Sequence, residues 1–257
     1  MRTIIAICMA TMMSSSFADT TLVFADDKGA NTVQIKEGIL RAGGRNDGHD
    51  YLLFDSKRRT ITDIDRRNKK YTRIDETSMK QMGGMITDMQ RQMEEQLKNL
   101  PPDQQAQMRQ MMAGLMPPGM DEAKQPVRNE PTSQTGKIGE WTCKIINIFK
   151  GDEKVSQVCA TDYKSLDIPE QDYLTMKEFM SFVANISENF PMADQVSFAS
   201  ADLGDGMLPV FVEMLQKSTK DRSMTLNKIN TETLERSLFT VPVGYTEQKV
   251  MQKKPQS

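Results

Sequence analysis

The sequence predicts an α+β fold that is built on one curved antiparallel sheet. Short apolar stretches alternate with polar residues about every 8–12 positions over 20–74, and again after residue 139, with turn residues between them. Between these two regions, apolar residues recur at intervals of three and four, which is typical of amphipathic helices. The expected domain covers residues 19–248, and a polar tail follows over 249–257.

Residues 1–18 have the pattern of a cleaved secretory signal peptide. Arg2 provides the positive start, and an apolar stretch over 3–13 follows it. This stretch is too short to cross a bilayer. Small residues, ending with Ala18, precede Asp19 in the way that signal peptidase requires. We therefore expect an exported, periplasmic protein whose mature chain begins at Asp19.

Neither lipidation nor a membrane span is expected. Cys8 is the only cysteine near the N-terminus, but Ile7 precedes it where a lipidation motif has a small residue. No later apolar run reaches 18 residues, the length at which a run is read as a membrane-spanning helix.

Six short strands are expected in the first part of the mature chain. Leu22 and Phe24 alternate with other residues, and Val33 and Ile35 do the same. Charged clusters such as 65–70 supply the turns between successive strands. The expected strands lie near residues 22–24, 33–35, 39–42, 51–54, 60–64 and 71–74.

A methionine-rich helical insertion is expected over 76–116. Methionine is unusually frequent in this chain, with 21 residues. Met, Ile or Leu recurs every three or four positions over 76–99, and Asp75 can cap the start of this helix. Two consecutive prolines end it, and a second helix is expected over 102–116. The proline-containing residues 117–135 are expected to form a linker.

The two cysteines of the mature chain are expected to form a disulfide. Cys143 and Cys159 lie in a chain with an export signal, and disulfides form in exported proteins. A hairpin centred on Gly151 would place the two cysteines directly opposite each other, about 5 Å apart, which suits a disulfide. Catalytic cysteine pairs usually form a Cys-x-x-Cys motif, so we favour a structural role over a redox role.

The C-terminal part is expected to add one helix and further strands. Apolar residues at helical spacing predict a helix over 169–189 whose inward positions are Leu174, Phe179, Val183 and Ile186. Leu208, Val210, Val212 and Met214 are expected to share one face of a strand. The expected strands of this part lie at about 139–149, 154–160, 207–216, 223–230 and 238–245.

The methionine stripe has three competing interpretations. It can be an ordinary core face, because methionine fills gaps between buried helices. It can also capture Cu(I) or Ag(I) through thioether sulfurs, with Met79, Met82 and Met85 as clustered soft ligands. Finally, it can be an adaptable apolar surface for a lipid, an acyl chain or a partner. The binding residues would then be Met79, Met82, Met89, Met93, Met108, Met111 and Met112.

Composition and motifs argue against several functional classes. Lys and Arg total 33 and Asp and Glu total 35, so the basic excess of a nucleic-acid-binding protein is missing. One histidine and three cysteines do not suffice for a multi-histidine zinc site. The sequence contains no recognisable nucleophile–base set, paired carboxylates or phosphate-binding glycine loop. We therefore predict neither an enzymatic activity nor a cofactor.

Five stretches of the mature chain together resemble a bacterial exported family that is known only as a domain of unknown function, numbered four-four-one-two. These stretches are Tyr51–Asp55, Met89–Pro102, Gly136–Cys143, Lys154–Cys159 and Leu238–Tyr245. The last one also resembles the closing strand motif of the lipoprotein-carrier (LolA/LolB-like) superfamily. This resemblance implies a curved, half-open antiparallel β-barrel with helices that cover its concave face, a periplasmic location and, by analogy, binding of acyl chains.

Taken together, the sequence predicts a non-enzymatic periplasmic binding protein for a hydrophobic ligand such as a lipid or an acyl chain. The expected partner is a hydrophobic small molecule, a lipid or a lipidated protein. Two alternatives stay open: a periplasmic protein that binds Cu(I) or Ag(I) through methionine, and an envelope assembly or interaction protein whose methionine face docks a partner helix.

Overall fold

The computed structural model describes residues 18–27, 29–43, 50–98, 101, 104, 126–189, 203–215 and 222–249. Apart from residue 104, which is helical, the expected helix over 102–116 lies outside these residues, as do nearly all of the expected signal peptide and polar tail.

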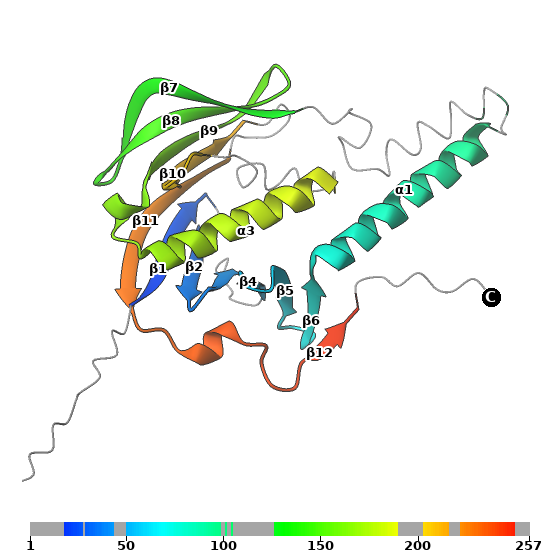
Figure 1. The fold of residues 1–257 in the computed structure, drawn as a ribbon, viewed down its shortest axis with the longest axis horizontal. Helices are drawn as coiled ribbons and strands as arrows, with labels where there is room; N and C mark the ends of the chain where they lie inside the picture. Colours follow the sequence, from blue (N-terminus) through cyan, green and yellow to red (C-terminus); the bar gives the residue numbers. More distant parts are fainter. Residues whose placement is uncertain are drawn as a thin grey trace, which may run out of the picture.

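The described residues form one 12-stranded sheet with the order β12-β6-β5-β4-β3-β2-β1-β11-β10-β9-β8-β7 (Figure 1). All neighbouring strands pair antiparallel except β12 and β6, which are parallel. The strands are β1 (Asp19–Asp26), β2 (Gly29–Lys36), β3 (Ile39–Gly43), β4 (Asp50–Asp55), β5 (Thr60–Asp65), β6 (Lys70–Ile74), β7 (Val127–Ile138), β8 (Trp141–Lys150), β9 (Glu153–Asp162), β10 (Met207–Met214), β11 (Arg222–Glu232) and β12 (Thr246–Gln248).

The expected half-open antiparallel barrel of the lipoprotein-carrier type is wrong. The sheet is open and mixed, and its edge strands β7 and β12 do not pair with each other. Two properties of these edges oppose closure: β7 contains Pro131, which has no N–H to donate, and β12 is only three residues long. Of the two α-helices among the described residues, α3 lies along one face of the sheet, whereas α1 extends beyond it (Figure 1).

The N-terminal meander agrees closely with the sequence prediction. Strands β1 to β6 each contain one of the expected alternating stretches and pair in chain order. Gly38 lies in the β2–β3 turn with a φ of 84°, and its carbonyl oxygen accepts hydrogen bonds from the N–H and the Oγ of Ser56 at 3.1 and 2.8 Å. These bonds tie the β2–β3 turn to the β4–β5 turn.

The first methionine helix is confirmed as α1 (Glu76–Lys98). Its start is capped as expected, because Asp75 Oδ1 accepts hydrogen bonds from the N–H and the Oγ of Ser78 at 2.7 and 2.8 Å. The same bonds lower the pKa of Asp75.

The expected linker over 117–135 is wrong for its second half, because β7 begins at Val127. This strand is mostly polar and carries Pro131, and a β-bulge interrupts its pairing with β8 between Pro131 and Thr135. An edge strand tolerates both features, since one side of its backbone has no neighbour to pair with.

The disulfide between Cys143 and Cys159 is confirmed, with a Cα–Cα distance of 5.3 Å. The predicted register is wrong, however: Cys159 lies opposite Ile145, and Cys143 lies opposite Gly136 of β7. The turn between β8 and β9 and a bulge at Ile148 and Phe149 together shift the pairing by two residues.

The expected third helix is confirmed as α3 (Glu170–Asn189), which follows the 3₁₀ turn η1 (Tyr163–Leu166). Phe54 of β4 packs against Phe179 and Phe182 with ring centroids 5.4 and 5.5 Å apart. Tyr173, Met176 and Val183 are also buried. Leu174, which we expected to face the core, is instead 42% exposed, and the side chain of Ile186 lies outside the described residues.

The single face that was expected for the strand with Leu208 to Met214 is split by a bulge in β10. Leu208 and Val210 join the main core with α3, whereas Val212 and Met214 join a second cluster on the other face of the sheet. The register between β10 and β9 shifts between Pro209 and Phe211, which exchanges the two faces at this point.

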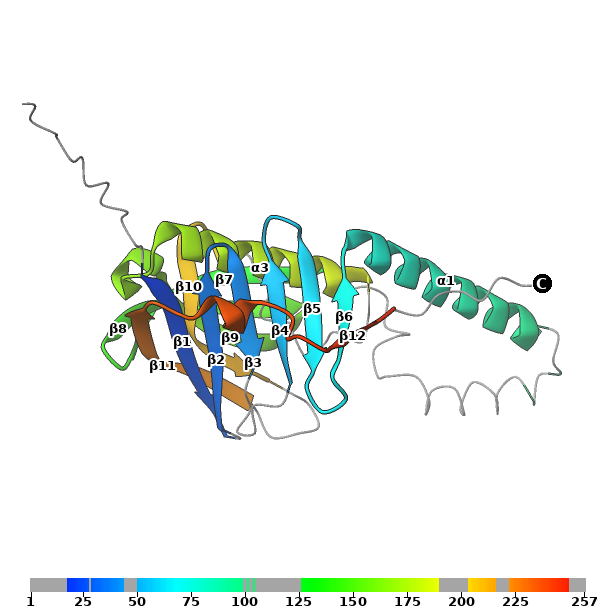
Figure 2. The ribbon, with the colours of Figure 1, turned by 90° about the horizontal axis from the view of Figure 1, so that it is seen from below.

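The end of the described chain crosses the sheet face opposite α3 (Figure 2). It contains the 3₁₀ turn η3 (Arg236–Phe239), and Val241 and Tyr245 then pack against Tyr51, Leu53 and Ile64. The strand expected over 238–245 is therefore wrong. Pro242 and Gly244, with a φ of 85°, break it, and only the short β12 forms after them.

Candidate functional site

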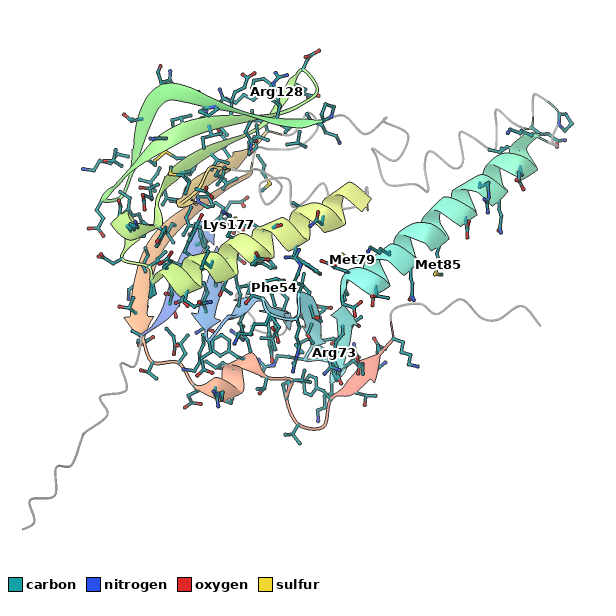
Figure 3. All side chains as sticks on the ribbon, in the orientation of Figure 1. Phe54, Arg73, Met79, Met85, Arg128 and Lys177 are labelled. Carbon is teal, nitrogen blue, oxygen red and sulfur yellow. A yellow bond between two sulfur atoms is a disulfide. The ribbon has the colours of Figure 1, made fainter. Side chains whose placement is uncertain are left out.

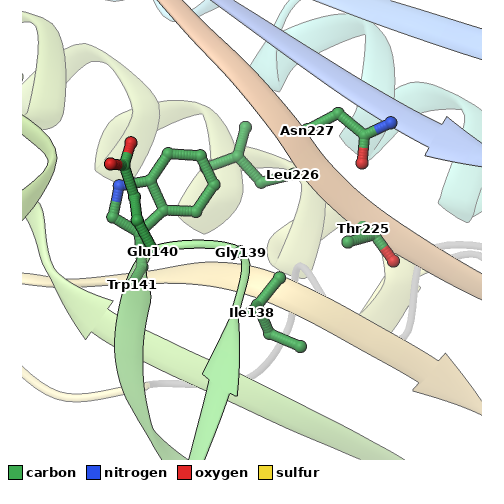
Figure 4. A pocket seen from close by; sticks show the side chains of 7 residues that line it. All are labelled: Ile138, Gly139, Glu140, Trp141, Thr225, Leu226 and Asn227. Carbon is green, nitrogen blue, oxygen red and sulfur yellow. The ribbon is translucent and has the colours of Figure 1, made fainter.

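A cavity of about 300 Å³ opens where the β7–β8 turn approaches β11 (Figure 4). This volume is at the lower end of the range for small-molecule pockets. Its lining consists of Ile138, Gly139, Glu140, Trp141, Thr225, Leu226 and Asn227. Residues about 85 positions apart in the chain thus meet at one site, which we call the Trp141 cavity.

The apolar side of the Trp141 cavity continues into the main core. Leu226 is only 2% exposed, and Ile138 and Trp141 are partly buried against the same cluster. Trp141 is the only tryptophan of the chain. An apolar group that enters the cavity can therefore replace water against the partly buried Trp141 indole ring and Ile138 side chain.

The local sequence explains how Trp141 reaches this position. Ile138 and Trp141 form the last residue pair of the β7–β8 hairpin, so only Gly139 and Glu140 remain for the turn. Gly139 has a φ of 57°, a conformation that glycine adopts without steric cost. Because paired residues point to the same face of a sheet, Ile138 and Trp141 both reach the cavity.

Polar groups complete the lining and limit its chemistry. Glu140 supplies one carboxylate, Thr225 one hydroxyl and Asn227 one carboxamide. Glu140 and Asn227 are exposed, so these groups border the cavity from the solvent side. The set can accept and donate hydrogen bonds to a polar head group. The lining contains no histidine, cysteine or lysine that could pair with the hydroxyl for nucleophilic chemistry.

The structure places Met79 in the main core rather than on a surface. Met79 is 6% exposed and belongs to the same cluster as Phe54 and Ile61. Figure 3 shows it at the end of α1 that adjoins the sheet, with Met85 farther out along the helix. Met82, Met89 and Met93 belong to α1, but their side chains lie outside the described residues, as do Met108, Met111 and Met112 altogether.

Met79 and Met85, two of the three methionines of the alternative Cu(I) or Ag(I) site, lie on different sides of α1. Six residues of an α-helix turn through about 600°, so Met79 and Met85 point in directions about 120° apart. Met79 is buried, whereas Met85 is only partly buried. The described part of the chain also holds no group of three or more His, Cys, Asp or Glu residues that could bind a metal ion.

Sequence reasoning missed the Trp141 cavity. The single tryptophan, two residues after a turn glycine, was the available signal for the β8 side. No signal pointed to Thr225, Leu226 and Asn227, because their approach depends on how far the sheet curves between β8 and β11.

None of the helices that the structure describes is both long and apolar enough to cross a membrane.

No family model matches the chain, and no curated protein matches it. Membership of the domain-of-unknown-function family therefore stays a prediction. Among solved structures, an uncharacterized conserved protein from Thermus thermophilus is similar over 91% of this chain and 92% of its own, at a TM-score of 0.44 and 5% identity. Two structures of PNGF-II are similar at TM-scores of 0.40 and 0.39 and 11% identity, and the matches span 91% of this chain but only about a third of that protein. At TM-scores below 0.5, none of these likenesses carries an argument about fold or activity.

Proposed function

We propose that this protein is an exported, non-enzymatic binding protein for a small hydrophobic or amphipathic molecule, such as an acyl chain with a polar head. The observation that carries the proposal is the Trp141 cavity, with its apolar wall of Trp141, Leu226 and Ile138 and its polar border of Glu140 and Asn227. Concave sites with an apolar lining and a few polar groups are the usual form of small-molecule sites.

The volume of the cavity restricts the size of the ligand that it can hold. A volume of about 300 Å³ fits the end of an acyl chain or a compact amphiphile, but not a complete two-chain phospholipid. Burial of apolar ligand surface supplies the affinity, at about 25 cal/mol per Å². The polar border then fixes the orientation of the ligand, because an unpaired polar head group would be costly to bury.

The single tryptophan makes this proposal directly measurable. Dodecanoate added to delipidated protein should change the intensity and wavelength of Trp141 fluorescence, because the indole lines the cavity. Native mass spectrometry of protein that is purified from a periplasm without detergent should then identify the natural ligand by its mass.

A pair of variants on one strand tests the location. Ile138→Glu places a charge in the apolar wall and should weaken dodecanoate binding at least about tenfold. Val127→Glu, at the other end of β7 and 47% exposed, is the matched control and should bind like the wild type. Equal affinities of both variants, or no fluorescence response in the wild type, would contradict the proposal.

A further inference from the structure

Strand β1 begins in a buried polar cluster at the expected first residue of the mature chain. The side chain of Asp19 is only 8% exposed. Its Oδ2 accepts hydrogen bonds from Lys36 Nζ and from the N–H of Leu234, both at 2.7 Å. Three distant parts of the chain, β1, β2 and the segment after β11, therefore meet at Asp19.

A second buried carboxylate lies beside the next residue. Thr20 is fully buried, and its Oγ1 donates a hydrogen bond of 2.6 Å to Oδ2 of Asp172 in the first turn of α3. Asp172 is 6% exposed. Burial raises the pKa of Asp172, and the negative charge of Asp19 raises it further, while hydrogen bonds from the hydroxyl and the N–H of Thr20 lower it.

Negative charge exceeds positive charge around this start of β1. Asp19 and Asp172 are buried, Glu232 lies opposite Asp19 in the pairing with β11, and Glu170 is exposed in the same turn as Asp172. Lys36 contributes a positive charge to this cluster, where it forms an ion pair with Asp19. The N-terminus of α3 adds a partial positive charge near Asp172.

Cleavage after Ala18 would add a cation at this place. It converts the main-chain nitrogen of Asp19 into an ammonium group. That nitrogen is one residue, about 3.4 Å along the strand, from Thr20, whose hydroxyl donates a hydrogen bond to Asp172. An ammonium group beside Thr20 would favour the ionised form of Asp172, because charges attract more strongly near a buried carboxylate than in water.

We propose that the α-ammonium group created at Asp19 by signal-peptide removal is a structural ion-pair partner of Asp172, so that cleavage itself stabilises the folded protein. This inference rests on the proposed export and on cleavage after Ala18, but not on the proposed ligand. N-terminal sequencing of the exported protein tests that premise separately, and a mature chain that starts elsewhere would overturn the inference while leaving the ligand proposal untouched.

Two chains with defined N-termini, released from a fusion partner, provide the main experiment. One begins at Asp19, and the other begins at Ala18, which moves the ammonium group one residue away. We expect the folded-to-unfolded equilibrium constant from urea unfolding to be about threefold to tenfold larger for the chain that begins at Asp19. Equal stability of the two chains would overturn the proposal.

Substitutions in α3 then identify the partner. Asp172→Asn keeps the acceptor for Thr20 but removes the charge, so it should abolish the difference between the two chains. Glu170→Gln removes an exposed carboxylate from the same helical turn and should leave the difference unchanged. A difference that persists in Asp172→Asn would assign the ammonium group to another partner and overturn the proposal.

A chemical readout avoids any dependence on folding of the variants. In the wild type that begins at Asp19, acetylation of the α-amine at pH 7 should be at least about threefold slower than in the chain that begins at Ala18, because an ion-paired ammonium group resists deprotonation. In concentrated urea, the two rates should differ only by the intrinsic reactivities of the Asp and Ala α-amines, and this ratio corrects the comparison of the folded proteins. Equal rates in the folded proteins would contradict the ion pair.

Discussion

A Cβ atom on Gly136 would lie 2.8 Å from the Sγ of Cys159, so β7 passes the disulfide in direct contact. The same Cβ would lie 3.4 Å from the Sγ of Cys143, the residue that pairs with Gly136. Because a disulfide bond cannot swing away like the end of a flexible side chain, residue 136 and the disulfide constrain each other.

Gly136→Ala should therefore destabilise the protein by about 1–3 kcal/mol, the usual cost of overpacking. Urea unfolding measures this change. Gly84→Ala is the control, because nothing lies within 4 Å of its added Cβ in α1 and alanine favours helices by up to about 1 kcal/mol. If Gly136→Ala were as stable as the wild type, β7 would not pack against the disulfide as described.

Loss of the disulfide should cost about 3 kcal/mol of unfolding free energy, because it closes a loop with a sequence separation of 16. Cys143→Ala combined with Cys159→Ala removes the disulfide, and urea unfolding with and without reductant measures the effect. In this background, Gly136→Ala should cost less than in the wild type, because the Sγ atoms that its Cβ would contact are gone. Additive effects would argue against direct contact.

Arg59 links the sheet to both helices. Its Nε lies 2.9 Å from Oε1 of Glu76 in α1, its Nη1 pairs with Glu178 of α3, and its guanidinium group lies over the ring of Phe182. These ion pairs are partly exposed, so Arg59→Gln should cost only about 0.5–1 kcal/mol, and less at high salt. Urea unfolding at low and high ionic strength tests this. Arg58→Gln, at a side chain that is 83% exposed, should change stability less.

Two aspartates of β5 should shift the pH dependence of stability in opposite directions. Burial raises the pKa of Asp63 above 3.8, and Asp50 and Asp65 raise it further, whereas hydrogen bonds from Asn68 lower the pKa of Asp65. The contribution of Asp63 is thus present at low pH and is lost as the pH rises through 3.8 and the raised pKa. That of Asp65 is present above 3.8 and is lost as the pH falls through its lowered pKa.

Unfolding free energies between about pH 3 and pH 7 measure both effects as differences from the wild type. As the pH rises, the stability of the wild type relative to Asp63→Asn should decrease, and its stability relative to Asp65→Asn should increase. Slopes of the same sign in the two comparisons would contradict the assigned environments.

Met79 distinguishes a core role from copper binding. Met79→Leu preserves apolar volume and should cost less than about 1.5 kcal/mol, whereas Met79→Ala should cost about 2–5 kcal/mol because Met79 is buried in the main core. Urea unfolding gives these values, and native mass spectrometry with Cu(I) gives the metal content. Copper binding by the wild type that Met79→Leu abolishes would show that the thioether acts as a ligand despite its burial.

The strands of the meander could be predicted because each has alternating apolar residues and a clear turn after it, as Leu22 and Phe24 show before the turn at Asp27. The polar strand β7 could not, since an edge strand with Pro131 has no buried alternation. Bulges also escape sequence reasoning, and the one at Ile148 was enough to move Cys159 from the expected position opposite Cys143.

The candidate site was harder to predict than the fold for a related reason. The methionine stripe is a pattern within one helix, so the sequence reveals it, although Met79 proved to be a core residue. The Trp141 cavity joins β8 to Leu226 of β11, and only the curvature of the whole sheet brings them together. Local periodicity contains no information about such long-range contacts.

The position of β1 between β2 and β11 has a consequence for folding. Its pairing with β11 joins residues that are more than 200 positions apart, such as Asp19 and Glu232. Long-range strand pairs form slowly, because the entropy of a large loop is lost before the contacts form. A chain that emerges from its N-terminus cannot complete the centre of the sheet until Arg222–Glu232 has been made. This long-range pairing delays completion of the sheet relative to a sheet whose strands all pair in chain order, and it leaves the β11 side of β1 without its partner until synthesis is nearly finished.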